Sequence, residues 1–414
     1  MNASKHVEYF FRHEYGKVVA VLCRRVGMHH LALVEDSVQV ALMTGLETWT
    51  KNGLPDNPSA WLYKVAWNKL IEKLRQQMRQ GALVAQQAQL QTCWQQNTQD
   101  QPAWQTDDDD LLFMLLACCN QSIPMESQLV LALKAVCGFS IEEIALRLFI
   151  TQANAYKRFS RAKGGFKNQA SNVWEQDIQV DEQRLSALRK LLYLIFTEGY
   201  LSLGHGASIR QELCEEAIRL TSILANNRFG KDPETFALLA LMHLQAARIA
   251  ARQDSSGGLL LLEQQDRCLW NQKMIETGLR WLQHSSSGGH FSRYHAEAGI
   301  AAEHCMAKSF ELTRWDRIIE SYVLLEQEAP SPLHRLNRAV AVAQWQGAAA
   351  GLAVIEGFQP PSWLVGCYQW SAVLAYLYRC NNEQDKANQY QELALGLAPT
   401  EALKALISNR FETM

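Results

Sequence analysis

Residues 140–167 have the sequence SIEEIALRLFITQANAYKRFSRAKGGFK, and this stretch decides how the N-terminal half of the chain is interpreted. Ser140, followed three residues later by Glu143, has the spacing of a capping box, which predicts the start of a helix. Apolar residues then recur at helical spacing, and Thr151 offers a second N-cap after a gap that allows only a tight turn. The stretch therefore predicts a helix-turn-helix.

The second helix of this pair has a packing face and a polar face. Asn154, Arg158 and Arg161 share one side, about 100° from a packing stripe of small and aromatic residues. That stripe consists of Ala155, Phe159 and Ala162. No Asp or Glu occurs between Ile144 and Trp174, whereas six basic residues do: Arg147, Lys157, Arg158, Arg161, Lys163 and Lys167. This charge predicts a nucleic-acid surface, and a solvated basic helix is the alternative.

Composition limits the classes of protein that the chain can represent. It has 414 residues, of which 48% are hydrophobic and 20% charged, with a formal net charge of −2. These values predict an ordinary globular protein of two to four domains. The near-neutral total hides a second basic segment at 64–80, where a single acidic residue, Glu72, stands among five basic ones. Two separate basic segments suggest that the protein contacts one polymer at two places.

The cysteines and the termini of the chain predict a reduced, cytoplasmic protein. Ten cysteines are scattered without metal-finger spacing, and the first 14 residues are polar and charged rather than a signal peptide. We interpret the adjacent Cys118 and Cys119 as buried thiols. No apolar run is long enough to span a bilayer, so we predict no membrane contact, and no motif calls for a metal or another cofactor.

Helical periodicity dominates the whole chain, and the sequence therefore predicts an all-α fold. Residues 81–106, rich in Gln and free of Lys and Arg, predict a linker. In the C-terminal half, a Leu followed by an Ala-Pro pair occurs twice: Leu325 before Ala329-Pro330, and Leu393 or Leu395 before Ala398-Pro399. The two Ala-Pro pairs are 69 residues apart, which is about two periods of a tetratricopeptide unit. Small residues such as Ala387 and Ala394 favour such a solenoid, and a non-repetitive helical bundle is the alternative.

A third predicted helix begins near residue 58. Asn57 can cap it, and Pro58 suits its first position. Polar and basic residues lie within about 60° of one another on one side: Lys64, Asn68, Arg75 and Arg79. A packing stripe runs along the other side: Leu62, Ala66, Leu70, Leu74 and Met78. Trp61 and Trp67 are interpreted as core aromatics, with base stacking as the alternative.

Several of these segments together resemble one protein family. The segments are Val34–Gln39, Asn57–Leu62, Asn68–Arg75, Asp109–Lys163, Leu192–Tyr200, Leu213–Leu220 and Glu263–Trp270. In order and spacing they are similar to bacterial extracytoplasmic-function sigma factors of the subgroup with a long tetratricopeptide-like C-terminal extension. The resemblance covers nearly the whole chain. It implies two small helical sigma domains, the second a helix-turn-helix, followed by a helical extension.

The resemblance also implies domain bounds. Sigma region 2 would occupy residues 1–80, here called the first module, and sigma region 4 would occupy 107–170, the second module. Residues 181–285 would form a helical extension and 286–414 the tetratricopeptide-like repeats. The implied function is an alternative sigma factor that binds core RNA polymerase and directs it to promoters. The C-terminal helices would regulate it by binding a protein or peptide ligand.

The resemblance assigns three sets of contact residues. Glu35, Asp36 and Gln39 would bind the clamp of the largest polymerase subunit. The −10 promoter element would be bound by Lys64, Trp67, Asn68, Arg75 and Arg79. The −35 element would be bound in the major groove by Thr151, Gln152, Asn154, Lys157, Arg158, Arg161 and Lys163. The chain departs from the family at Val40, usually Glu, at Trp67, often Arg, and at Asn120-Gln121, often His-Pro.

Two other classes of function compete with this interpretation. One is an ordinary helix-turn-helix regulator joined to a protein-binding helical scaffold, which would bind duplex DNA without polymerase. The other is an enzyme that uses Glu198, a carboxylate among aromatic residues whose pKa could be raised. No nucleophile, metal-ligand pair or phosphate loop accompanies Glu198, which favours a structural role for it. We therefore expect a protein that is not an enzyme.

Overall fold

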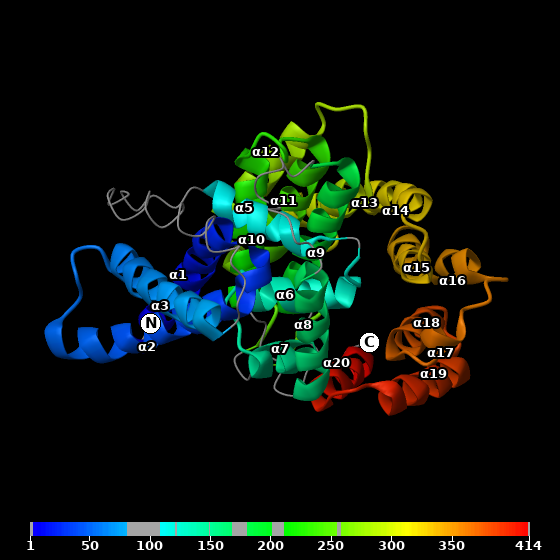
Figure 1. The fold of residues 1–414 in the computed structure, drawn as a ribbon. Helices are drawn as coiled ribbons and strands as arrows, with labels where there is room; N and C mark the ends of the chain where they lie inside the picture. Colours follow the sequence, from blue (N-terminus) through cyan, green and yellow to red (C-terminus); the bar gives the residue numbers. More distant parts are fainter. Residues whose placement is uncertain are drawn as a thin grey trace. The chain divides into compact units, whose positions relative to one another are not determined.

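The computed structural model describes residues 3–80, 108–120, 122–148, 150–167, 180–200, 211–254 and 258–412. The chain divides into two compact units, the N-terminal unit Met1–Ile195 and the C-terminal unit Phe196–Met414 (Figure 1). Within the described residues the regular structure is helical, and the single β-bridge joins Gln253 to Leu259. The all-α prediction is confirmed for that part of the chain.

The N-terminal unit is built from short and long α-helices. Its α-helices are α1 (Ala3–Val26), α2 (Leu31–Asn52), α3 (Pro58–Gln80), α5 (Asp108–Cys118), α6 (Met125–Ala135), α7 (Ile141–Arg147), α8 (Gln152–Lys167) and the larger part of α9 (Glu182–Tyr200). A short 3-10 helix, η1 (Met28–His30), joins α1 to α2. α2 and α3 pack along each other, and α1 packs on α2 and on α5.

The helix α3 begins as its sequence predicts. Asn57 accepts a hydrogen bond from the backbone N–H of Ala60 at 3.0 Å, and Pro58 occupies the first helical position. The predicted packing stripe is buried at its four described positions: Leu62, Ala66, Leu70 and Leu74. The side chain of Met78 lies outside the described residues. Burial of this stripe is what fixes α3 on the unit and turns its polar side outward.

The helix α1 packs closely against the segment that follows α6. A Cβ atom added at Gly16 would lie 2.0 Å from the carbonyl oxygen of Val136, so only glycine allows this approach. Val19 and Leu22 on α1 are fully buried, as are Met114 and Leu115 on α5. The first and second modules therefore share one hydrophobic core in this unit.

The C-terminal unit continues with helices and one long irregular stretch. Its helices are α10 (Gln211–Asn226), α11 (Pro233–Ala246), α12 (Gln272–Ser285), α13 (Arg293–Met306), α14 (Trp315–Glu328), α15 (Pro332–Gln346), α16 (Ala348–Ile355), α17 (Ser362–Val365), α18 (Tyr368–Cys380), α19 (Gln384–Leu397) and α20 (Glu401–Glu412). Short 3-10 helices lie between α11 and α12: η2 (Ile249–Ala251), η3 (Leu262–Gln264) and η4 (Arg267–Leu269).

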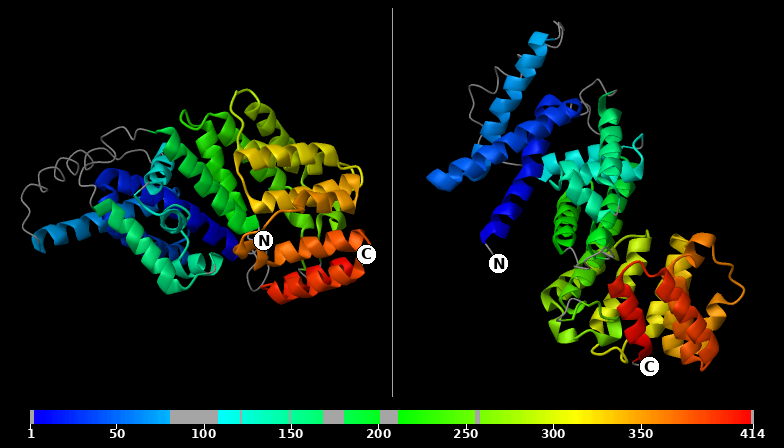
Figure 2. Two further views of the ribbon diagram at one scale, coloured as in Figure 1. Left: turned by 90° about the vertical axis from the view of Figure 1, so that its right-hand side faces the viewer. Right: turned by 90° about the horizontal axis from the view of Figure 1, so that it is seen from below.

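Helices of the C-terminal unit stack as successive neighbours, as Figure 2 shows for α13 to α20. The two Ala-Pro pairs singled out in the sequence each follow a helix directly, since α14 ends at Glu328 and α19 ends at Leu397. Ala387 and Ala394 are fully buried where α19 packs on its neighbours. Small side chains there let neighbouring helices approach closely.

Candidate nucleic-acid interface

The junction of α7 and α8 is fixed by two side-chain caps. Glu143 accepts a hydrogen bond from the Ser140 backbone N–H at 2.7 Å, and Ser140 Oγ accepts one from the Glu143 N–H at 3.1 Å. The predicted capping box is therefore confirmed. Thr151 Oγ1 accepts a hydrogen bond from the Asn154 N–H at 3.2 Å, which caps α8, and four residues separate α8 from the end of α7.

The helix α8 has one buried and one exposed side. Ala155, Phe159 and Ala162 are buried where α8 packs on α6 and α7, as the sequence predicts. The exposed side carries Thr151, Gln152, Asn154, Lys157 and Arg161. Arg158 is half-buried at the border between the two sides. Sequence reasoning passed over Tyr156, which is 61% exposed among these polar residues; its only signal was an aromatic ring placed off the packing stripe.

Lys163 does not point outward with the other basic residues of α8. It is half-buried, and its Nζ atom lies 4.4 Å from the centre of the Phe159 ring. Its charge also acts on the buried carboxylate of Glu35, whose pKa it lowers. Lys163 thus lies at the inner edge of the helix, apart from the exposed set.

The helix α3 presents the second basic surface. Lys64, Asn68 and Arg75 are exposed on it, and the side chain of Arg79 lies outside the described residues. Lys69 forms an ion pair with Glu72 at 2.7 Å. Trp67 is half-buried and stacks on Tyr63, with ring centres 6.5 Å apart.

Two of the tryptophans near this surface are held by neighbours. The Arg25 guanidinium lies 5.3 Å from the Tyr63 ring centre and 5.6 Å from that of Trp67, so one cation packs against both rings. Trp61 packs edge-on against Trp49, with ring centres 5.4 Å apart. Trp61 and Trp67 are both half-buried, so the choice between a core role and base stacking stays a prediction for each.

The three residues assigned to polymerase contact do not share one environment. Asp36 and Gln39 are exposed on α2, and Asp36 pairs with Lys73 of α3 at 3.4 Å. Glu35 is only 5% exposed, so its carboxylate is absent from the surface in this structure. The exposed side of α2 also carries apolar residues: Val40, already noted as a departure from the family, and Met43 and Leu46, which sequence reasoning passed over. Their helical spacing from Asp36 was the available signal.

Glu35 lies among groups from several helices. The Tyr15 hydroxyl donates a hydrogen bond to its Oε1 atom at 3.4 Å. Burial raises the pKa of Glu35 to about 7, against the opposing effect of Lys134 and Lys163. The burial of Glu35 could have been inferred from helical spacing. Glu35 lies four residues after Leu31 and three before Val38, so it falls on the apolar stripe of α2.

Glu198, Cys118 and Cys119 are the other residues that the sequence singles out for possible chemistry. Glu198 lies half-buried on α9 and makes interactions of its own. No group of three or more His, Cys, Asp or Glu side chains within the described ranges is arranged to hold a metal ion. Cys118 and Cys119 are buried, as expected, and burial raises the pKa of Cys119 to about 12. Such a thiol is unreactive at neutral pH.

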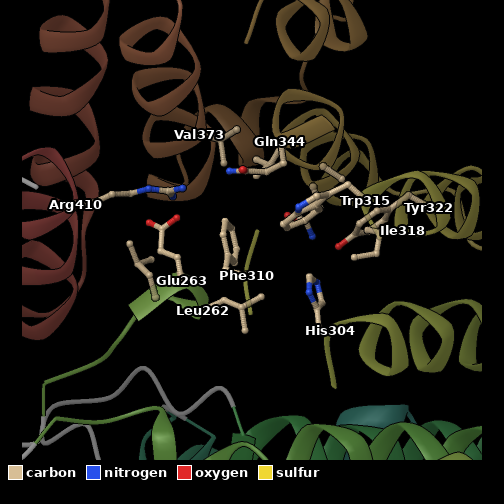
Figure 3. Close-up of a pocket in the computed structure, with 14 residues that line it drawn as sticks. Leu262, Glu263, His304, Phe310, Trp315, Ile318, Tyr322, Gln344, Val373 and Arg410 are labelled. Carbon is tan, nitrogen blue, oxygen red and sulfur yellow. The ribbon is translucent and has the colours of Figure 1, made fainter. Parts of the chain in front are cut away.

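The C-terminal unit contains a cavity of about 340 Å³ between α14, α15, α18 and the stretch around η3. Figure 3 shows Arg410 and Glu263 facing each other at one end, with Phe310 between them and the side chains of Trp315 and Tyr322. Arg410 also lies over Tyr376, 3.8 Å from its ring centre. The cavity thus combines aromatic walls with a pair of opposite charges.

His304 closes the aromatic end of this cavity. Its ring packs edge-on against Trp315 with centres 5.4 Å apart. Burial lowers the pKa of His304 to about 3, and the charges of Arg248 and Arg267 act in the same direction. The imidazole is therefore neutral at physiological pH, and the wall at this end carries no charge from it.

A search of the described helices finds none long and apolar enough to cross a membrane.

Comparison with known proteins places these helices in a family. Residues 10–80 match sigma-70 region 2, and residues 184–286 match a family of unknown function, DUF6596. An uncharacterized protein of Rhizobium meliloti (strain 1021) is 36% identical over 332 residues, which cover 79% of this chain and 77% of that protein. No solved structure matches the chain. The chain therefore belongs to the same family as this Rhizobium protein, with a sigma-70 region 2 at its N-terminus and a DUF6596 domain after it.

Proposed function

We propose that this protein is an alternative sigma factor of the extracytoplasmic-function type. The observation that carries the proposal is the match of residues 10–80 to sigma-70 region 2, over three helices whose outward sides differ in chemistry. α2 presents acidic and apolar side chains, whereas α3 presents polar and basic ones. A protein partner suits the first surface and a nucleic acid the second.

The exposed side of α2 is the proposed contact with the clamp of the largest polymerase subunit. Asp36 and Gln39 supply polar groups, and Met43, 64% exposed, supplies apolar area beside them. Exposed apolar side chains bordered by charge are typical of interfaces. The apolar area contributes affinity, and the charged groups fix how the two partners are aligned. Val40, where the family usually has Glu, adds to the apolar part in this chain.

The exposed side of α3 is the proposed contact with the −10 element. Lys64 and Arg75 are available for phosphates, and Asn68 for base edges. The stack of Trp67 on Tyr63 would offer a flat surface to a base once the strands separate. The sigma family that the chain resembles often has Arg where Trp67 stands, so the stacking would take over part of that contact here.

The pair α7 and α8 is the proposed helix-turn-helix for the −35 element. Asn154, Lys157 and Arg161 are exposed on α8, beginning with the first turn of the helix. The N-terminal part of a recognition helix is the part that reaches base edges in the major groove. Thr151 and Gln152 are exposed at that same end and suit phosphate contacts.

The tetratricopeptide-like C-terminal helices would regulate the sigma modules through a bound protein or peptide. The cavity near Trp315 and Tyr322 supports this, since aromatic walls suit an apolar side chain of a peptide. The Arg410 and Glu263 pair at the other end would hydrogen-bond to the peptide backbone. Binding there would bias the equilibrium between active and inactive arrangements.

The proposal is tested by run-off transcription with purified core polymerase and promoters mapped in cells. A sigma factor binds core polymerase and makes it initiate at specific sites. The alternative, an ordinary helix-turn-helix regulator, would bind duplex DNA by itself and leave core polymerase unable to initiate. Failure to bind core polymerase would overturn the proposal.

A further inference from the structure

The buried carboxylate of Glu35 is hydrogen-bonded within the first module and feels the charge of two lysines of the second module. Tyr15 of α1 donates its hydrogen bond to Glu35 at 3.4 Å from within the first module. The cations that lower its pKa, Lys134 on α6 and Lys163 on α8, both belong to the second module. Lys134 also lies 5.7 Å from the centre of the Tyr15 ring. We call these four residues the Glu35 cluster.

Two further contacts hold the modules together beside this cluster. Arg24 near the end of α1 forms an ion pair with Asp110 of α5, and its guanidinium lies 5.7 Å from the Phe113 ring centre. Gly16 packs on the backbone of Val136. α1 therefore buries one side against its own module and another against the second module.

The two modules are in direct contact here, whereas the two promoter elements are far apart on DNA. Elements near −10 and −35 lie about 25 base pairs apart, which is about 85 Å of duplex. α1, the longest helix described, has 24 residues and is only about 36 Å long. The 27 residues between Gln80 and Asp108 can span about 90 Å when extended, so the chain permits separation.

We propose that Glu35, through Tyr15 and Lys134, latches the first module to the second in the free protein, and that the latch opens when the modules separate to engage polymerase and promoter. The latch itself is a property of the free chain, whereas its regulatory role rests on the proposed sigma function. Opening would release Lys163 from the Glu35 cluster and return it to the basic side of α8.

The charges around Glu35 determine how the latch responds to pH. On α1 and α5 its neighbours are Tyr15, Cys23 and Cys118, whose pKa values are all raised by burial, so they are neutral at physiological pH. The charged neighbours are Asp36 beside it on α2, Lys134 on α6 and Lys163 on α8. The two lysines lower the pKa of Glu35, but their effect is smaller than the rise caused by burial.

The direction of the response follows from linkage. In the closed state the pKa of Glu35 is about 7, above its ordinary value of 4.5, so the closed state binds the proton more tightly than the open state. Closure is therefore fully favoured below about pH 4.5 and weakens as the pH rises through about 7. The ratio of closed to open protein should fall by roughly tenfold to a hundredfold between pH 5 and pH 8.

Single-molecule energy transfer in the full-length protein tests the latch without polymerase. A ketone-bearing unnatural residue at Gln76 on α3 and another at Ser160 on α8 would carry the dyes, because both positions are exposed and lie outside the Glu35 cluster. The wild-type protein should change from mostly closed to more open between pH 5 and pH 8. Glu35→Gln, an isostere of the protonated acid, should stay closed at pH 8.

A matched control and a second variant separate the latch from general effects. Glu47→Gln makes the same chemical change at an exposed position of α2 and should behave as wild type. Burial lowers the pKa of His30 to about 4, but His30 titrates in every variant, so the difference between wild type and Glu35→Gln isolates Glu35. Lys134→Met should open the protein several-fold at pH 8, where Glu35 is ionised, and much less at pH 5.

Three outcomes would overturn the latch: identical pH curves for wild type and Glu35→Gln, the same change produced by Glu47→Gln, or equal opening of Lys134→Met at both pH values. A protein that shows the predicted opening but never binds core polymerase would retain the latch and lose the sigma function. The two proposals can therefore fail separately.

Discussion

The hydroxyl of Tyr15 donates a hydrogen bond to the carboxylate of Glu35 over 3.4 Å, twenty residues along the chain, and both side chains are buried. The sigma resemblance assigns all three of Glu35, Asp36 and Gln39 to polymerase contact. Glu35 is buried in this hydrogen bond, whereas Asp36 and Gln39 are exposed. The same helix thus carries an exposed side with Asp36 and Gln39 and a buried carboxylate on its inner side.

Removal of a base-reading arginine on α8 should change promoter selectivity. Arg161→Ala and Arg158→Ala should each reduce transcription from the matching −35 sequence by about tenfold to a hundredfold, because a base contact is worth about 1–3 kcal/mol. Lys157→Ala, as loss of a phosphate contact, should weaken all promoters evenly. Run-off transcription on wild-type and −35-mutated templates measures this. If both arginine variants behave as wild type on every template, α8 does not read that element.

Lysines placed on the exposed side of α2 should weaken binding to core polymerase. Asp36→Lys combined with Met43→Lys removes an anionic and an apolar contact and should weaken the affinity at least about tenfold. Fluorescence anisotropy with labelled protein measures the change. Glu126→Lys, the same reversal at an exposed position of α6, serves as the control. Equal affinities for the α2 variant and this control would exclude the surface.

A methyl group at Gly16 should loosen the contact between the modules. Its Cβ would lie 2.0 Å from the Val136 carbonyl oxygen, so Gly16→Ala should cost about 1–3 kcal/mol of unfolding free energy. Gly164 on α8 has no atom within 4 Å of such a Cβ, and Gly164→Ala should be neutral or stabilising by up to about 1 kcal/mol. Chemical denaturation compares the two. A Gly16→Ala protein as stable as Gly164→Ala would contradict this packing.

Filling the cavity of the C-terminal unit should alter transcription but not folding. Val373 lines the cavity, so Val373→Trp should block a peptide and shift activity away from the wild-type level. Val365, 49% exposed elsewhere, provides the matched control as Val365→Trp. Transcription in cells, with core affinity measured in parallel, separates regulation from assembly. Identical activities of the two tryptophan variants would mean that the cavity has no regulatory role.

The helices and their packing stripes could be predicted from the sequence because their causes are local. The Ser140 and Glu143 cap, the Asn57 cap and the buried face of α8 each depend on residues a few positions apart. The environments of Glu35 and Lys163 could not be predicted from local spacing. They depend on groups from helices more than 120 residues apart in the chain, which periodicity does not record.

The cavity of the C-terminal unit could not be predicted from local spacing either. Its walls come from Glu263, Trp315, Val373 and Arg410, which are far apart in sequence and meet only because successive helices stack. Individually they have the spacing of ordinary helix residues. Tyr156 and Met43 are a different case, since each lies off a packing stripe and its exposure could have been inferred from the helical period alone.

Promoter opening by core polymerase tests the central claim most directly. Permanganate detects unpaired thymines, so footprints of a mapped promoter would be compared for core polymerase alone, for core with this protein, and for core with the Asp36→Lys and Met43→Lys double variant. We expect thymines near −10 to become reactive with the wild-type protein only. Protection of the duplex by the protein alone, with no reactive thymines when core polymerase is added, would contradict a sigma factor and favour an ordinary DNA-binding regulator.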